Sequence, residues 1–447
     1  MNRPDTPGLC RRPSLRLLSA GLLLLLLGMY VLLAPETGKR VDQDWSHLWL
    51  GGRMIVTGHT ERMYDPELQV EVYRQADPAG RPPAVWTKRN EILGCFYYPP
   101  PTAVPYAALA WLPRPTAAVA NAYLTLGLTL LLAGMLARNI DPRLPWAAVA
   151  AIILAYPPFF INLSLGQNGV FSTFLLVAAW CLCNRRRDLL AGLVLGLFIC
   201  KPNWLLAIGW IPLVHRRWRV LLGMCLGAAS VLAATLILLG PRPFVDYADL
   251  FHKVSKVNQI PGYRLSLQYN GLGLFRKWLG TGSTAAGVLG GASCILLALV
   301  TWRVCRGAWQ PGTRRFQLMM ACSLMAALWI NPHLYYYDLV PAAICLVPLV
   351  LDWKMLGRTG RAVAVLVSIF TYAAVPWDRL WSWGTVFPVP CFAILALWGW
   401  FAYRLACPYA ERSIPEEGLA PGSPTDPRST GSVSPIQTPP GLKPAAR

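Results

Sequence analysis

Charge is scarce in this sequence. Only 14% of the 447 residues are charged, whereas 55% are apolar. Soluble globular domains carry roughly 25% charged residues, so this composition excludes an ordinary soluble protein. Apolar runs long enough to enter a bilayer, which takes about 20 residues per helix, recur along the chain. The sequence therefore predicts an all-α polytopic membrane protein.

Motifs for soluble cofactors and for metals are also lacking. The chain has no Walker loop, no dinucleotide fingerprint and no heme or zinc motif, so we expect no cofactor and no bound metal. Acidic residues are few: 21 Asp and Glu stand against 41 Lys and Arg, which gives a formal net charge of +20. The basic residues form short clusters between apolar runs, as in cytoplasmic loops, and this distribution does not indicate a nucleic-acid partner.

The apolar runs predict about twelve membrane segments, and the basic clusters alternate with them in the order that the positive-inside rule requires. Both termini are then cytoplasmic, and no small-residue cleavage site follows the first run, which we expect to be an uncleaved span. The predicted segments are 16–34, 116–137, 145–163, 169–183, 189–200, 203–214, 220–240, 284–302, 316–331, 339–351, 362–377 and 385–403.

The predicted domain organisation has three parts. A cytoplasmic tail, 1–15, precedes a membrane domain, 16–405, and a second cytoplasmic tail, 406–447, is rich in Pro, Ser and Gly and is expected to be disordered. The membrane domain contains two external loops, 35–115 and 241–283.

The external loop 35–115 is long for a connection between two membrane helices. It contains helix-like pieces around 46–57 and 66–76, followed by the sequence "FYYPPPTAVPYAALAWLP" from residue 96. The apolar part of that sequence is too short to cross a bilayer and is typical of an interfacial segment. We therefore expect short interfacial helices in this loop.

Lys201 stands between two unusually short apolar segments, 189–200 and 203–214. Neither is long enough to cross a hydrocarbon core of about 30 Å alone, so the pair is either a broken hairpin or two tilted spans. A lysine at membrane depth is costly unless an anion offsets its charge. Lys201 either contacts a lipid phosphate or extends its ammonium group to the interface.

Two carboxylates, Asp42 and Asp44, follow the first apolar run and lie next to Trp45 and Trp49. Indole rings favour the headgroup level, where a carboxylate could act as a base on a substrate held by lipid. The spacing Asp42-Gln43-Asp44 also matches the D-x-D pattern that holds a divalent metal in some sugar transferases. Alternatively, both carboxylates are solvated loop residues that balance nearby basic side chains.

Two further polar segments are predicted on the external side. Gln167 and Asn168 interrupt the apolar sequence and either bind sugar hydroxyls or form the turn that Asn-Gly favours. His333 and Asp338 flank three tyrosines in "NPHLYYYD". This cluster either binds a substrate and orients a base or belongs to an interfacial aromatic belt.

The order of these motifs resembles glycosyltransferase family 87. The resemblance rests on Asp44-Trp45, on Gly58 followed by Tyr64-Asp65-Pro66, and then on "FYYPPP", "LAWLP", Gly166-Gln167-Asn168, "RRRDLLAGLVLGLFICKPNW" and "NPHLYYYD". It extends over about residues 16–400. The sequence departs from the usual pattern at Trp45, where Phe is more common, at the additional Asp42, and in its tyrosine-rich run.

The resemblance implies a GT-C-like bundle with a periplasmic active site in a bacterial inner membrane. The implied donor is a polyprenyl-phosphate sugar, with mannose as the first sugar to consider, and the acceptor is a lipid or a glycan. Asp44 corresponds to the acidic residue of the family and would be the general base, while Lys201 and Arg264 would neutralise the leaving phosphate. His333, Gln167, Asn168 and Tyr64 would bind the substrates.

Two other classes fit parts of the pattern. A transporter or flippase for a lipid-linked sugar also has many spans and broken helices, but no internal repeat is visible and the external loop 35–115 is asymmetric. A non-catalytic assembly partner would leave the polar residues at 44, 167, 201 and 333 far apart.

Overall fold

The computed structural model describes residues 13–39, 44–78, 85–86, 92–94, 96–140, 144–254, 268–352, 356–380 and 388–407. All of them belong to one compact unit, Met1–Pro408, and the second unit is Tyr409–Arg447. The predicted disordered tail, 406–447, lies outside the described residues except for Ala406 and Cys407.

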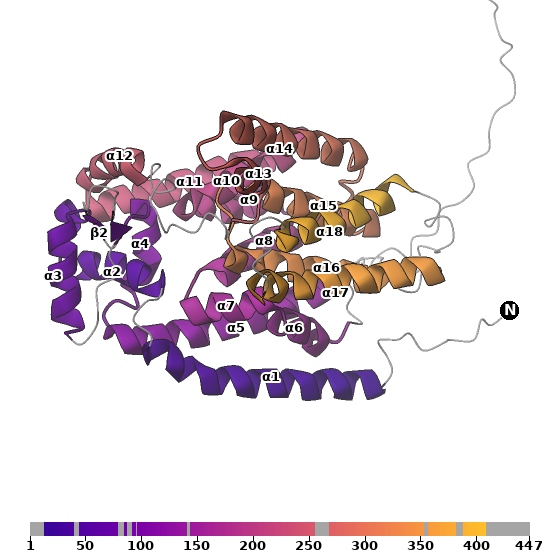
Figure 1. The fold of residues 1–447 in the computed structure, drawn as a ribbon, viewed down its shortest axis with the longest axis horizontal. Coiled ribbons are helices and arrows are strands. Elements are labelled where there is room, and N and C mark those ends of the chain that lie inside the picture. The colour runs from indigo at the N-terminus through magenta and orange to yellow at the C-terminus, as the bar shows by residue number, and fades with distance from the viewer. Residues whose placement is uncertain are drawn as a thin grey trace, which may run out of the picture. The chain divides into compact units, whose positions relative to one another are not determined.

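Helices make up nearly all of the described structure, as the composition predicts (Figure 1). A two-stranded antiparallel hairpin is the exception among the described residues. The elements are α1 (Pro13–Lys39), α2 (Asp44–Val56), η2 (Thr60–Arg62), α3 (Pro66–Ala76), β1 (Val85–Trp86), β2 (Ile92–Gly94), α4 (Pro100–Ala107), α5 (Arg114–Ile140), α6 (Trp146–Leu154), α7 (Pro157–Leu165), α8 (Gly169–Asn184), α9 (Asp188–Gly196), η3 (Leu197–Cys200), α10 (Pro202–Val214), α11 (Trp218–Leu239), α12 (Arg242–Val254), α13 (Gly271–Leu279), α14 (Thr284–Val304), α15 (Arg314–Ile330), η6 (Tyr336–Leu339), α16 (Val340–Asp352), α17 (Arg358–Leu380) and α18 (Val389–Ala406).

Each predicted apolar segment falls on a helix or on a pair of helices, but the predicted number of spans is not confirmed. Five helices are long and apolar enough to cross a membrane, and a bent pair makes a possible sixth. Among the described residues, the apolar stretches Gly169–Asn184, Asp188–Cys200, Pro202–Val214 and Tyr336–Leu349 are shorter, and α17 has 23 residues but is not among the five. The five are α1, α5, α11, α14 and α18.

The predicted segment 145–163 is a bent pair of helices. α6 and α7 meet at an angle of 67°, and α7 begins with Pro157 and Pro158. Proline has no N–H to donate to the preceding turn and its ring clashes there, so α6 cannot continue through this site. A second break follows at Lys201, where Pro202 begins α10 and the lysine backbone is extended (φ −141°, ψ 70°).

α9 and α11 pack with their backbones in direct contact. Gly192 and Gly196 of α9 face Gly223 and Gly227 of α11, and a Cβ atom on any of the four would clash with main-chain atoms of the other helix. Small residues spaced four apart allow this close approach between membrane helices. The position of Lys201, at the end of η3 just after α9, is therefore fixed relative to α11.

The segment between α1 and α5 builds its own hydrophobic core from α2, α3, α4 and the start of α5. α2, α3, α4 and α12 lie together at one end of the helical body (Figure 1). The prediction of a helix at 66–76 is confirmed: Asp65 accepts hydrogen bonds from the N–H groups of Glu67 and Leu68, and Pro66 occupies the first helical position. A buried ion pair between Arg114 and Asp77, with Nε and Oδ2 2.5 Å apart, ties this region to α5.

Candidate active site

Asp44 is the first residue of α2 and is partly accessible to solvent. Gln167, which is buried, donates a hydrogen bond from Nε2 to Oδ2 of Asp44 at 2.7 Å. A neutral amide donor orients a carboxylate without neutralising it. This hydrogen bond to one carboxylate oxygen therefore fixes the orientation of the Asp44 side chain, while Asp44 remains partly accessible to solvent.

The turn between α7 and α8 positions Gln167. Gly166 ends α7 in the left-handed conformation (φ 63°), and a side chain at this position would also clash with Trp45 beside Asp44. The N–H of Gln167 donates to the carbonyl of Asn162 at 3.0 Å. The turn is thus packed directly against the start of α2, which explains how residues 123 positions apart in sequence meet.

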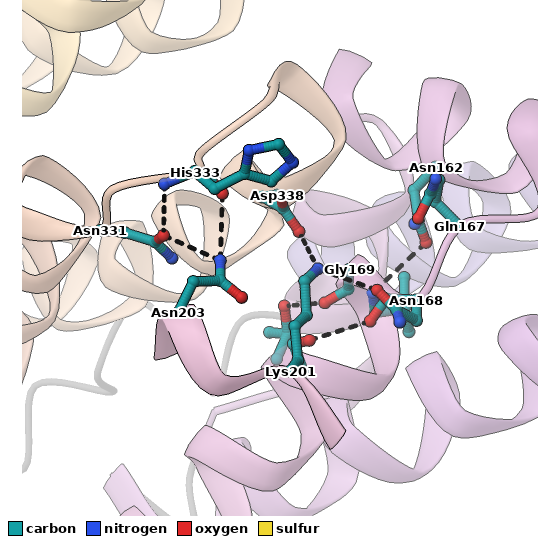
Figure 2. A network of polar contacts seen from close by, with 12 residues as sticks. Asn162, Gln167, Asn168, Gly169, Lys201, Asn203, Asn331, His333 and Asp338 are labelled. Carbon is teal, nitrogen blue, oxygen red and sulfur yellow. Dashed lines mark hydrogen bonds and ion pairs between the residues drawn. The ribbon is translucent and has the colours of Figure 1, made fainter. Parts of the chain in front are cut away.

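Lys201 lies between Asn168 and Asp338 (Figure 2). Its ammonium group donates to Oδ1 of Asn168 at 2.8 Å and forms an ion pair with Oδ1 of Asp338 at 2.5 Å. Asp338 is 1% exposed and Lys201 17%. Because Gln167 and Asn168 are consecutive, one turn connects Asp44 to Lys201. We call Asp44, Gln167, Asn168, Lys201 and Asp338 the charged network.

His333 lies beside this network, in the connection between α15 and η6. Its backbone N–H donates to Oδ1 of Asn331 at 3.1 Å, and its carbonyl accepts from Nδ2 of Asn203 at 3.0 Å (Figure 2). Asn203 also donates to Asn331 at 2.9 Å. Asn203 is two residues after Lys201, so this amide pair fixes the His333 backbone close to the lysine.

Burial lowers the pKa of His333; the negative charge of Asp338 opposes this shift and the positive charge of Lys201 adds to it. His333 is nevertheless exposed to solvent, and the lowered pKa leaves its imidazole mostly neutral at pH 7. Tyr337 lies close enough to Asp44 and Asp338 to experience both charges. Its ring centroid is 6.0 Å from the ammonium group of Lys201. A neutral imidazole and a phenol adjoin the charged network, and both groups can hydrogen-bond a hydroxyl.

The structure brings together four of the predicted site residues, Asp44, Gln167, Asn168 and Lys201, and places His333 beside them. Tyr64 is elsewhere: it is buried in the core around α2 to α4 and donates to the carbonyl of Tyr98 at 2.6 Å. Burial raises the pKa of Tyr64 well above its ordinary value.

Arg264 and Asp42 lie outside the described residues. Within the part of the chain that is described, no group of three or more His, Cys, Asp or Glu side chains is arranged to hold a metal ion.

Two contributors to the site, Asn203 and Asn331, were missed at the level of sequence, and a third, Asp338, was identified without its partner. Asn203 and Asn331 join the lysine segment to the His333 segment, and Asp338 pairs with Lys201. The signal for Asn203 was its position in "KPNW", and the signal for Asn331 was its position at the start of "NPHLYYYD". Asp338 was noticed beside His333, but nothing in the sequence indicated its ionic partner.

These features define an integral membrane protein with a charged, partly accessible site among its helices. The family model of glycosyltransferase family 87 matches residues 96–332, more than half of the chain, and the protein belongs to that family. No curated protein and no solved structure matched. The protein is thus a glycosyltransferase with a sugar donor and an acceptor, and the transporter alternative is not favoured.

Gln167, Asn168 and Lys201 lie inside the matched range, whereas Asp44 and Asp338 lie outside it. The hydrogen bonds connect both carboxylates to the matched part of the chain. A non-catalytic assembly partner was expected to leave residues 44, 167, 201 and 333 far apart, and they are instead joined through side chains and the short "KPN" segment.

Proposed function

We propose that this protein transfers a sugar from a polyprenyl-phosphate donor to a lipid or glycan acceptor, with inversion at the anomeric carbon. The donor sugar is a hexose or pentose, with mannose as the first candidate. The observation that carries the proposal is the hydrogen bond from Gln167 to Asp44, which orients a partly accessible carboxylate one turn away from a lysine. Together these residues offer a base and a cation at one site.

The reaction requires one proton transfer and one substitution. Asp44 accepts the proton of an acceptor hydroxyl while the oxygen of that hydroxyl attacks the anomeric carbon of the donor sugar. The bond from the anomeric carbon to the phosphate oxygen breaks. The electron pair leaves with the polyprenyl phosphate on the opposite face of the sugar. Lys201, and Arg264 from the external loop 241–283, stabilise the phosphate charge that develops. Because Lys201 and Arg264 would neutralise the negative charge of the leaving phosphate, we propose that the reaction requires no metal.

Binding of the two substrates is assigned to the neutral polar groups. Gln167 donates to Asp44, Asn168 accepts from Lys201, and the His333 carbonyl accepts from Asn203, two residues after Lys201. We propose that His333, Gln167 and Asn168 bind sugar or acceptor hydroxyls. Tyr64 contacts the backbone of Tyr98 in the first external loop. We propose that it acts on the acceptor side, by shaping the loop that borders Asp44.

The active site is proposed to face the periplasm of a bacterial inner membrane, with both termini in the cytoplasm and about twelve membrane segments. Three helices support this orientation. α8 begins beside the site and ends next to the cluster Arg185–Arg187. α10 begins just after Lys201 and ends next to Arg216–Arg217, and α15 begins at Arg314 and ends just before Asn331. The site thus lies at the helix ends opposite to the basic clusters, which favour the cytoplasm.

A transfer assay tests the proposal directly. Purified protein in detergent receives a panel of radiolabelled polyprenyl-phosphate sugars and a membrane lipid extract, and products are separated by mobility. We expect a labelled product with one donor of the panel, in the presence of EDTA as well as in its absence. Transfer from a nucleotide sugar but from no lipid-linked donor would contradict the proposal, and loss of product in EDTA would contradict its metal-free form.

A further inference from the structure

The ammonium group of Lys201 is already engaged by two acceptors, Asn168 and Asp338. Lysine has three donor hydrogens, and Lys201 remains partly accessible to solvent. A phosphate group could therefore reach the remaining donor. It would then share the lysine with the carboxylate of Asp338, which is almost fully buried and pairs through only one of its oxygens.

The charge balance of the described network is unfavourable for an anion. Asp44 and Asp338 carry two negative charges against the single positive charge of Lys201. In a site of low dielectric, the carboxylate at 2.5 Å from Lys201 offsets most of the attraction that the lysine would otherwise exert on phosphate. Asp338 thus lowers the affinity of the site for the group that Lys201 is proposed to bind.

This effect differs between donor and product. In a polyprenyl-phosphate sugar the phosphate is a diester with one negative charge, whereas the released polyprenyl phosphate is a monoester that carries about −1.5 to −2 near pH 7. An unopposed lysine would hold the more highly charged product more tightly than the donor. Such a site would be inhibited by its own product, and product release would limit turnover.

We propose that Asp338 is a positioning residue that competes with phosphate for Lys201 and thereby speeds the release of polyprenyl phosphate. The inference rests on the proposed function, because it assumes a phosphate leaving group at Lys201. Asp338 touches no reacting atom. It acts through the lysine, whose Nζ it holds between η6 and the turn that carries Asn168.

The variant Asp338→Asn tests this role, because asparagine keeps the acceptor oxygen for Lys201 but removes the charge. The probes are farnesyl phosphate, a short polyprenyl phosphate, and farnesol, which lacks the phosphate. We expect the variant to bind farnesyl phosphate about tenfold more tightly, the scale of a charge-assisted hydrogen bond, with farnesol binding unchanged. In steady state, KM for the donor and kcat should both fall, with stronger inhibition by polyprenyl phosphate.

Two controls separate this effect from a general loss of structure. Asp246→Asn removes a carboxylate from a different ion pair, Arg242 Nε to Asp246 Oδ1 at 2.9 Å, and should leave farnesyl phosphate affinity unchanged. Adding Lys201→Met to Asp338→Asn should abolish the gain in affinity. If Asp338 only supports the fold, the single variant should instead lower the unfolding temperature and weaken or leave unchanged the binding of farnesyl phosphate, which would overturn the inference.

The binding assay and the transfer assay together distinguish a failure of this inference from a failure of the proposed function. If the wild type transfers sugar from a polyprenyl-phosphate donor but Asp338→Asn binds farnesyl phosphate no more tightly, the role of Asp338 is wrong and the proposed function stands. If the wild type transfers no sugar from any such donor, the proposed function fails, and the premise of this inference fails with it.

Discussion

α8 carries a polar network at each of its ends, and the two networks differ in kind. At one end lies the charged network. At the other, Nε1 of Trp180 donates to Oε1 of Gln317 at 2.7 Å, and Gln317 donates to Asn184 at 3.3 Å. Asn184 in turn donates to Oδ1 of Asn139 at 3.0 Å. We call these four residues the amide cluster.

The amide cluster contains only neutral groups that hydrogen-bond one another across α5, α8 and α15. Such interhelical hydrogen bonds between neutral side chains hold membrane helices together, and within the cluster only Nδ2 of Asn139 is buried without a partner. The charged network instead keeps a carboxylate and a lysine within reach of solvent. Charge at such a position is expensive, and its retention indicates chemistry rather than packing. Variants in the two networks should therefore have opposite consequences for activity and for stability.

The largest effect is expected for Asp44→Asn. The amide cannot accept a proton from the acceptor, so transfer should fall by about 10³-fold, within the range for loss of a general base. The hydrogen bond from Gln167 can be kept because the amide oxygen remains an acceptor, and the unfolding temperature in detergent should not change. Initial rates with the preferred polyprenyl-phosphate sugar measure this. Wild-type turnover in the variant would rule out Asp44 as the base.

Gln167→Leu should have the next largest effect, because it leaves Asp44 in place but removes its orienting donor. We expect the transfer rate to fall by roughly 30-fold. This loss is smaller than the factor of about 10² by which a 1 Å misplacement of a reacting group can lower the rate. The loss should appear mainly in kcat. A variant that loses donor binding with unchanged kcat would show that Gln167 acts only as a substrate ligand and does not orient Asp44 for catalysis.

In the amide cluster, Gln317→Leu should reverse this pattern. It leaves the buried Nε1 of Trp180 without its acceptor, and a buried unsatisfied donor costs about 1–3 kcal/mol of unfolding free energy. Denaturant unfolding of the detergent-solubilised protein measures this loss. Transfer per folded molecule should remain at the wild-type level, and a large loss of activity at full folding would contradict the comparison.

The smallest effect concerns pH. The pKa of His333 is lowered in the folded protein, so the unfolded chain takes up the proton first as pH falls. Stability that depends on neutral His333 is therefore complete above its ordinary pKa, near 6.5, and is lost as pH falls through the folded value. The unfolding temperature of wild type should drop more between pH 7.5 and 5.5 than that of His333→Asn. Equal drops in unfolding temperature for wild type and His333→Asn would show that His333 does not contribute to this pH dependence of stability.

Local features of the fold could be predicted from sequence, and contacts between distant segments could not. A helix was predicted at 66–76 and α3 spans those residues; Asp65 and Pro66 explain its start, because a cap and a proline act on their own helix. The bend between α6 and α7 was missed, although Pro157-Pro158 marks it, because the run was interpreted by hydropathy alone.

For the site, the sequence identified the polar residues but not their partners. Asp44 meets Gln167, and Lys201 meets Asp338, across 123 and 137 positions. No periodicity in a single sequence encodes such pairings, which depend on how several helices pack. Lys201 was consequently expected to be a free cation for phosphate, whereas its charge is shared with Asp338.

The contact between the glycines of α9 and α11 has a consequence for changes in chain length. Gly192 and Gly196 admit only one register against Gly223 and Gly227, and Lys201 follows this contact directly along the chain. Leu197–Cys200 form the 3-10 helix η3, so one residue inserted or deleted between Gly196 and Lys201 would rotate the lysine by about 120° around the helix axis, away from Asp338 and Asn168. Loops elsewhere can absorb such changes, so homologous chains should vary in loop length while the distance along the chain from Gly196 to Lys201 stays constant.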